Sequence, residues 1–140
     1  MIADMADKVT ASLNAEDFSL DFTAVRRYVP IFELSDLDSL QVSVIPRGRE
    51  DTPLTRGTDQ REVEIQVGVQ KRVASLAASD VDPLVALTEE IADHLTRQHL
   101  GDSDEYRWLR TEFTAVYSPE DLREKRVYTG VVTATYRHFN

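Results

Sequence analysis

The chain has 140 residues and a formal net charge of −9, with 41% hydrophobic and 29% charged residues. These values indicate one soluble globular domain, and the acidity disfavours nucleic-acid recognition because no lysine/arginine block offsets it. The lack of cysteine excludes disulfides, thiol catalysis and cysteine-ligated metals, and the sequence shows neither a membrane-spanning apolar run nor the basic start and apolar block of a secretory signal.

A helix and a strand are predicted at the start of the chain. Apolar residues recur on one helical stripe from about Ile2 to Ala15, which predicts an amphipathic helix. The alternation of apolar and polar residues from Phe18 to Ala24 then predicts a half-buried strand. Pro30 lacks an N–H group, so we expect the later part of this strand to lie at an edge or a bulge.

Two further strand patterns enclose an unusual polar stretch. Residues Leu40–Val44 and Val63–Val69 alternate apolar with polar side chains, as strands with one buried face do. The stretch between them holds two glycines and two prolines, and it predicts a long flexible loop at about 46–60. Ordinary hairpin loops have about 2 to 5 residues. We therefore expect this loop to serve a function.

The second half of the chain predicts one main helix followed by two strands. Asp82–Pro83 suits the start of the helix, with the aspartate as the N-cap and the proline in the first turn, and Gly101 suits its end. Strand patterns follow at Leu109–Tyr117 and Arg126–His138, separated by a short helical turn that Ser118–Pro119 would cap. Both faces of the last strand are partly apolar, which indicates a central strand or one paired at an interface.

These elements together predict one α+β domain over residues 1–140. The expected order is α-β-β-β-α-β-β. In the two-layer arrangement that this order favours, a mostly antiparallel sheet of about five strands carries two main helices on one face.

The polar residues form no catalytic or metal-binding pattern. His94 and His99 point to different sides of a helix, whereas zinc-binding helices offer ligands at i and i+4. Glu90 and His94 do have that spacing, but a solvated helix face explains them better. Asp36 and Asp38 lack the glycine turn and distant glutamate of a calcium loop, and linker polarity accounts for them. Since no serine lies in a nucleophile-elbow context either, we expect no catalytic, cofactor-binding or metal-ligating residues and no enzyme activity.

Four arginines in and beside the predicted loop lead to two hypotheses. They are Arg47, Arg49, Arg56 and Arg61. In the first hypothesis, the loop is mobile and its charges only aid solubility. In the second, the loop becomes ordered on a partner and its planar guanidinium groups bind carboxylates, which other copies of this acidic chain would supply. Trp108 likewise either packs under a helix or loop or anchors a partner.

Several segments spread over nearly the whole chain carry a family resemblance. They are the opening amphipathic helix, "LQVSVIPRGRE", "TRGTDQREVEIQVGVQKRV", "DPLVALTEEIADHL" and "SPEDLREKRVYTGVVTATYRH". The ending weighs most, because "REKRVYTG" precedes a Val/Thr strand that closes on Tyr-Arg. With these segments the chain resembles the tail-terminator proteins of tailed bacteriophages, also called tail-completion or minor tail proteins. The resemblance implies a small α+β fold, in agreement with the prediction from the patterns.

The resemblance also implies a structural role without a cofactor. Such proteins form a ring, commonly a hexamer, that caps the finished tail tube, stops its polymerisation and offers a surface to the head connector. The expected partners are other copies of this chain, the tail tube protein and head–tail connector proteins, with no nucleic acid or membrane. The expected location is the head–tail junction of the virion, with the host cytoplasm during assembly. Family loops between strands reach the tube or a neighbouring subunit, which by position implies this role for Arg47, Arg49 and Arg56.

Two alternatives stay open at this point. One is a head–tail connector protein of similar architecture, and the other is a small enzyme or ligand-binding α+β domain with a pocket over the sheet. Under the leading hypothesis, deletion of Glu50–Gly57 leaves a folded protein that fails to cap tubes.

Overall fold

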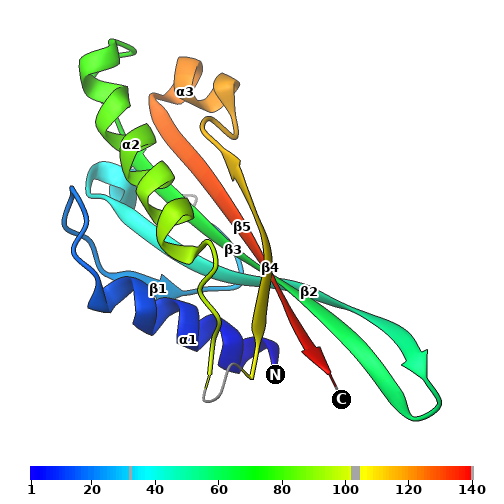
Figure 1. Ribbon diagram of the computed structural model, residues 1–140. Coiled ribbons are helices and arrows are strands. Elements are labelled where there is room, and N and C mark those ends of the chain that lie inside the picture. Colours follow the sequence, from blue (N-terminus) through cyan, green and yellow to red (C-terminus); the bar gives the residue numbers. More distant parts are fainter. Residues whose placement is uncertain (32, 102–104, 140) are drawn as a thin grey trace.

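The computed structural model describes residues 1–31, 33–101 and 105–139. Within these ranges, five strands form one sheet in the order β1-β2-β3-β5-β4 (Figure 1). The strands are β1 (Ala24–Arg26), β2 (Gln41–Thr55), β3 (Thr58–Arg72), β4 (Arg107–Thr114) and β5 (Val127–Phe139). Strand β1 runs parallel to β2, and the other neighbouring pairs are antiparallel. The predicted α+β fold with a mostly antiparallel sheet is therefore confirmed.

Two long helices, α1 (Ile2–Ala15) and α2 (Ala78–Leu95), pack on one face of this sheet (Figure 1). Their inward stripes are almost completely buried and consist of Met5, Val9, Leu13, Leu84, Leu87, Ile91 and Leu95. Below them lie the inward side chains of β3, namely Val63, Ile65, Val67 and Val69, all 0% exposed. Burying each such side chain stabilises the fold by roughly 1.5–3 kcal/mol. This layer is the hydrophobic core, and the bounds predicted for α1 are confirmed.

Both predicted ends of α2 are wrong. The helix begins at Ala78, so Asp82 is not its N-cap and Pro83 lies inside it. Its N-cap is Ala77, and the Ser75 hydroxyl fixes the first turn to the preceding segment, because it donates to Asp80 Oδ2 at 2.5 Å and accepts the Ala77 N–H at 3.2 Å. At the other end the helix stops at Leu95, and Arg97 rather than Gly101 follows it in the left-handed conformation, with φ 65°.

The first predicted strand is much shorter than expected. Only Ala24–Arg26 pairs with β2, while Phe18, Leu20 and Phe22 lie outside any strand and pack half-buried against the core. The side chain of Asn14 shapes this segment, because its amide group bonds both the N–H and the carbonyl of Ala24 at 2.8 and 3.1 Å. The alternating pattern from Phe18 therefore reflects packing against the core without strand pairing.

The predicted flexible loop at about 46–60 is wrong, because this stretch belongs to a regular hairpin. Strand β2 continues to Thr55, β3 begins at Thr58, and only two residues form the turn between them. Gly57 lies in this turn with φ 86°, a conformation that glycine adopts without strain. The register slips at two places in β2, where Arg47 and Leu54 are the extra residues of β-bulges.

The C-terminal elements follow the prediction closely. Helix α3 (Pro119–Lys125) begins at the N-cap Ser118, whose hydroxyl accepts the Asp121 N–H at 3.3 Å. Strand β5 lies between β3 and β4, which confirms a central position. Strand β4 ends at Thr114, before the predicted end at Tyr117, so Tyr117 is outside it and 64% exposed. A short 3-10 helix, η1 (Leu34–Asp38), and α3 are the additions to the predicted order. Among the described residues, no helix is long and apolar enough to span a bilayer.

Candidate functional site

The four arginines of the sequence prediction lie along the β2–β3 hairpin and do not gather in one place. Arg49 Nε lies 3.0 Å from Asp51 Oδ1, and Arg61 Nε lies 3.9 Å from Asp51 Oδ2. These two arginines therefore share one carboxylate. Arg47 and Arg56 are exposed and form no ion pair with any described residue. Arg56 lies in the turn, at the far end of the hairpin from the helices (Figure 1).

The outer part of this hairpin forms an exposed arm. Residues 49–57 are all exposed, and they include Leu54, 49% exposed, at the second bulge. On the neighbouring side, β5 stays paired with β3 as far as Gln60, which faces Phe139. The base of the arm, as far as Thr52 of β2 and Gln60 of β3, is therefore three-stranded, and Pro53–Asp59, which we call the tip, extends beyond the supporting strand β5.

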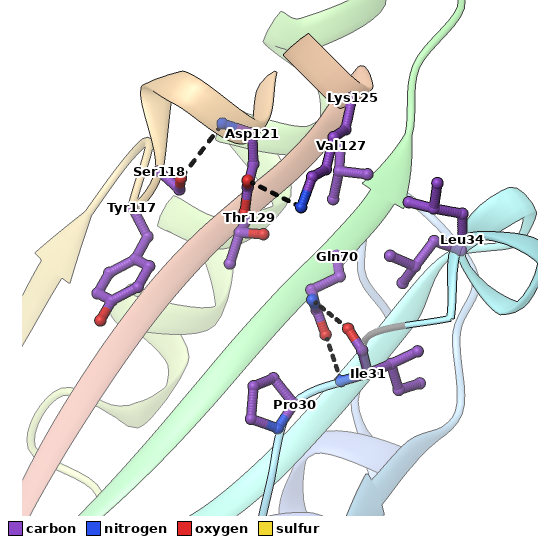
Figure 2. A pocket seen from close by; sticks show the side chains of 11 residues that line it. Pro30, Ile31, Leu34, Gln70, Tyr117, Ser118, Asp121, Lys125, Val127 and Thr129 are labelled. Atoms are coloured by element: carbon purple, nitrogen blue, oxygen red, sulfur yellow. Dashed lines mark hydrogen bonds and ion pairs between the residues drawn. The ribbon is translucent and has the colours of Figure 1, made fainter. Parts of the chain in front are cut away.

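A groove lies on the face of the sheet opposite α1 and α2. Its volume is about 220 Å³, and Figure 2 shows the residues that line it. One wall is formed by Pro30, Ile31, Leu34 and Leu37, and the other is formed by Tyr117, Ser118 and α3. A second hollow of about 120 Å³ shares Pro30, Gln70, Tyr117 and Thr129 with it and continues toward Ile45 and Val131.

The first wall of the groove is held in place by Gln70 of β3. The Gln70 amide accepts the Ile31 N–H at 3.1 Å and donates to the Ile31 carbonyl at 3.0 Å (Figure 2). Just upstream, the Arg27 N–H donates to the Val44 carbonyl at 2.9 Å and the Arg27 guanidinium to Ser43 Oγ at 2.9 Å. Polar residues of the sheet thus fasten a loop over its open face and create the groove.

The lining of the groove suits apolar side chains better than group-transfer chemistry. Its charged residues are Asp121 and Lys125, which lie one helical turn apart and pair with each other at 3.6 Å. The remaining lining is apolar or neutral, and the large side chains Leu34 and Tyr117 are 41% and 64% exposed at its rim. Such exposed apolar surface is typical of binding grooves.

Two polar residues of α2, Glu90 and His94, contact the N-terminal segment and are not only solvated. His94 Nε2 lies 2.9 Å from Ser12 Oγ, and His94 Nδ1 lies 3.8 Å from Glu16. Glu90 accepts hydrogen bonds from the backbone and the hydroxyl of Ser19. Serine, histidine and glutamate are the residue types of acyl-transfer enzymes, but Ser12 lies inside α1, where backbone N–H groups are engaged in the helix and do not form an oxyanion hole. The arrangement tethers α2 to α1 and to the segment that follows α1.

The other polar candidates are also in structural contacts. His99 Nδ1 accepts the Trp108 N–H at 3.0 Å, and Asp38 pairs with Arg72 at 3.2 Å. Trp108 packs half-buried against the core and its indole donates to Thr111 at 2.8 Å, as the packing hypothesis for it expects. In the described ranges, no three histidine, aspartate or glutamate side chains gather as metal ligands.

Comparison with protein-family models finds no match to this chain, and comparison with curated proteins finds none either. The resemblance to tail-terminator proteins thus rests on the sequence segments alone.

The sequence does not predict the groove, because the residues that line it are far apart in the sequence. One local signal does bear on the groove. Tyr117 directly precedes the predicted helix start at Ser118–Pro119, so it does not belong to the preceding strand and its side chain need not follow the alternation of that strand.

Proposed function

We propose that this protein is a non-catalytic structural protein of a phage or prophage tail. Copies of it form a ring that caps the tail tube, stops tube polymerisation and presents a surface to the head-joining proteins. The observation that carries the proposal is the exposed arm of the β2–β3 hairpin. Its residues 49–57 are all exposed, and none of them belongs to the hydrophobic core. A long exposed arm on a small domain is surface available for a partner.

Two distinct surfaces favour a ring subunit over an isolated domain. A subunit of a cyclic ring contacts its two neighbours through different patches, and this chain offers the tip at one end and the groove at the other (Figure 1, Figure 2). The arm is a hairpin and not a loop, so binding through it avoids most of the entropy cost of ordering a flexible segment. This changes the expected mechanism, because the arm need not fold on its partner.

Arg47 and Arg56 are the arginines of this proposal that can bind a new carboxylate. Arg49 and Arg61 already share Asp51, and a new partner would have to compete for them. We expect the acidic contacts of the tube or of neighbouring copies to involve mainly Arg56 at the turn and Arg47 at the first bulge.

Electron microscopy of the protein mixed with purified tail tubes tests the proposal. The shortened variant replaces Pro53–Asp59 by Asn-Gly, a sequence that forms a tight two-residue hairpin turn, and it is preferable to removing Glu50–Gly57, which would leave residues of β3 unpaired. The wild type should cap tube ends, and the shortened variant should fold but leave tubes uncapped. The variant Leu76→Ser, at an exposed leucine outside the hairpin, is the matched control. Capping by the shortened variant at the wild-type level would contradict the proposal.

The alternative of a head–tail connector protein predicts a different outcome in the same experiment. A connector protein of this architecture would bind the head-joining complex and leave the ends of isolated tubes bare. The ligand-binding alternative would place a small apolar molecule in the groove, where Gln70 and the hydroxyl groups of Ser118 and Thr129 offer polar contacts.

A further inference from the structure

We infer that the hairpin tip of one copy docks into the open-face groove of the next copy. The occupant of the groove is a second copy of this chain, which inserts Pro53 and Leu54 and places Arg56 against the rim. The inference deepens the proposed function, since it names the contact between copies, and it rests on that function for the closure of a ring.

The tip cannot reach the groove of its own chain. Gln41 pairs with Gln70, which lines the groove, whereas Thr55 pairs with Thr58 at the tip. These two points are separated by the whole of β2, which at the rise of a β-strand is about 45 Å. Helix α3, which contributes Asp121 and Lys125 to the groove, and the β2–β3 turn therefore lie at opposite ends of the molecule (Figure 1). Contact between them requires two copies.

The two surfaces match in their apolar character. At the tip, the bulge residue Leu54 is 49% exposed and Pro53 beside it is exposed. At the groove, the rim residues Leu34, Tyr117 and Pro30 are exposed, and Ile31 and Val127 are more buried (Figure 2). Docking would cover apolar surface on both partners, which is the main favourable contribution to association.

The two surfaces also match in charge. Arg56 at the tip has no ion-pair partner among the described residues. On the groove side, Glu33 next to Leu34 and Glu120 next to Asp121 are exposed, and neither pairs with a basic group in the described part of the chain. A guanidinium group can bind such carboxylates in a planar, hydrogen-bonded geometry.

The outer edge of β2 argues for side-chain docking over strand addition. Pro46 and Pro53 cannot donate to a new strand, and the bulges at Arg47 and Leu54 interrupt the regular spacing of its hydrogen-bonding groups. Prolines and bulges are the devices by which edge strands avoid pairing with other chains. A neighbouring copy would therefore meet the tip through its side chains and not extend the sheet along β2.

A tip-to-groove contact is heterologous, because it joins two different surfaces. Such contacts produce closed rings when the rotation between copies closes and open filaments when it does not. Each copy in the assembly would use its tip once and its groove once.

Cysteine cross-linking tests the contact directly, because the sequence contains no native cysteine. One differently tagged copy carries Leu54→Cys and the other carries Leu34→Cys, and a short bismaleimide links the two thiols. The control pair combines Leu54→Cys with Leu76→Cys, a leucine of similar exposure to Leu34 but outside the groove. We expect the groove pair to cross-link at least about tenfold faster, since docking holds the two thiols at a millimolar effective concentration. Equal rates for the two pairs would overturn the inference.

A charge exchange gives a second, independent readout. The substitution Arg56→Glu on the copy with Leu54→Cys should slow the groove cross-link several-fold, and Glu33→Arg together with Glu120→Arg on the copy with Leu34→Cys should restore it. An unchanged cross-linking rate in Arg56→Glu would show that Arg56 does not take part in the contact.

The cross-link and the capping of tubes can fail separately. If the wild type caps tubes but the groove pair links no faster than the control pair, the proposed function stands and this inference falls. If the groove pair cross-links but no tube is capped, the docking stands and the proposed function falls.

Discussion

Gly130 of β5 lies directly beneath Thr88 of α2, so that a Cβ atom at position 130 would be 2.6 Å from Thr88 Oγ1. The Tyr128 hydroxyl would be equally close, at 2.5 Å, and it is held by Thr88 at 3.1 Å and by the Ala115 carbonyl at 2.6 Å. Helix α2 therefore approaches the sheet at a point where only glycine fits.

The substitution Gly130→Ala should destabilise the protein. The helix or the Tyr128 side chain must shift, and such overpacking costs about 1–3 kcal/mol. Urea unfolding would measure the loss. Gly68→Ala is the matched control, because an added Cβ there meets nothing within 4 Å, and we expect it to be neutral or slightly stabilising. Equal losses for the two variants would show that close packing under α2 is not the cause.

The contact between His94 and Ser12 should stabilise the docking of α2 on α1. In a double-mutant cycle of His94→Ala and Ser12→Ala, we expect a coupling free energy of about 0.5–1.5 kcal/mol, as for a partly buried hydrogen bond. The control is Asp93→Ala, at an exposed position of the same helix. Activity on activated esters that disappears in Ser12→Ala would contradict the structural role and indicate a hydrolase.

The buried tyrosines predict a loss of stability in alkaline solution. Burial, assisted by the Asp4 carboxylate, raises the pKa of Tyr106 to about 12, and burial also raises the pKa of Tyr128 and of Tyr136. In the unfolded chain a tyrosine has a pKa of about 10. Below that pH the tyrosines are protonated in both states, and their contribution to stability is fully present. Above it the unfolded state loses protons that the folded state retains, so the free energy of unfolding falls as the pH rises toward the folded pKa values.

The variant Tyr136→Phe isolates one part of this effect. The Tyr136 hydroxyl is buried and has no hydrogen-bond partner among the described residues. Its removal should therefore cost little stability at neutral pH, and it should reduce the decrease in the free energy of unfolding above a pH of about 10. Denaturant midpoints at several alkaline pH values measure both. An alkaline slope identical to that of the wild type would count against the prediction.

The wall of the groove should depend on Gln70. The variant Gln70→Leu removes both hydrogen bonds to Ile31 and leaves two backbone groups without their partner, which costs about 1–3 kcal/mol if they stay buried. Hydrogen exchange should show faster exchange at Ile31, with little change at Val67 in the centre of β3. Unchanged protection at Ile31 would mean that other contacts hold this wall.

The elements that the sequence predicts well are those with a local cause. The stripe from Ile2 to Leu13 needs only one apolar layer beneath it, and Ser118 caps α3 with its own side chain. The two apolar faces of β5 similarly indicated a central strand. In these places the local pattern and the tertiary contacts favour the same structure.

The hairpin and the groove depend on residues that are distant in the sequence. Pro46 and Pro53 resemble loop residues, but an edge strand tolerates them because its outer N–H groups have no partner. Pairing with β3 therefore makes this stretch a strand and not a loop. The groove joins Pro30, Gln70 and Tyr117 from three separate segments, and no local pattern could bring them together.

The pairing of β3 with β5 as far as Gln60 has a geometric consequence for any assembly of this chain. A three-stranded ribbon resists bending, so the direction in which the tip leaves the body is set by the coiling of the strands. If each tip sits in a neighbour's groove, that coiling fixes the angle between successive subunits. Lengthening both arm strands by one residue pair would then change the subunit number or turn a closed circle into a spiral.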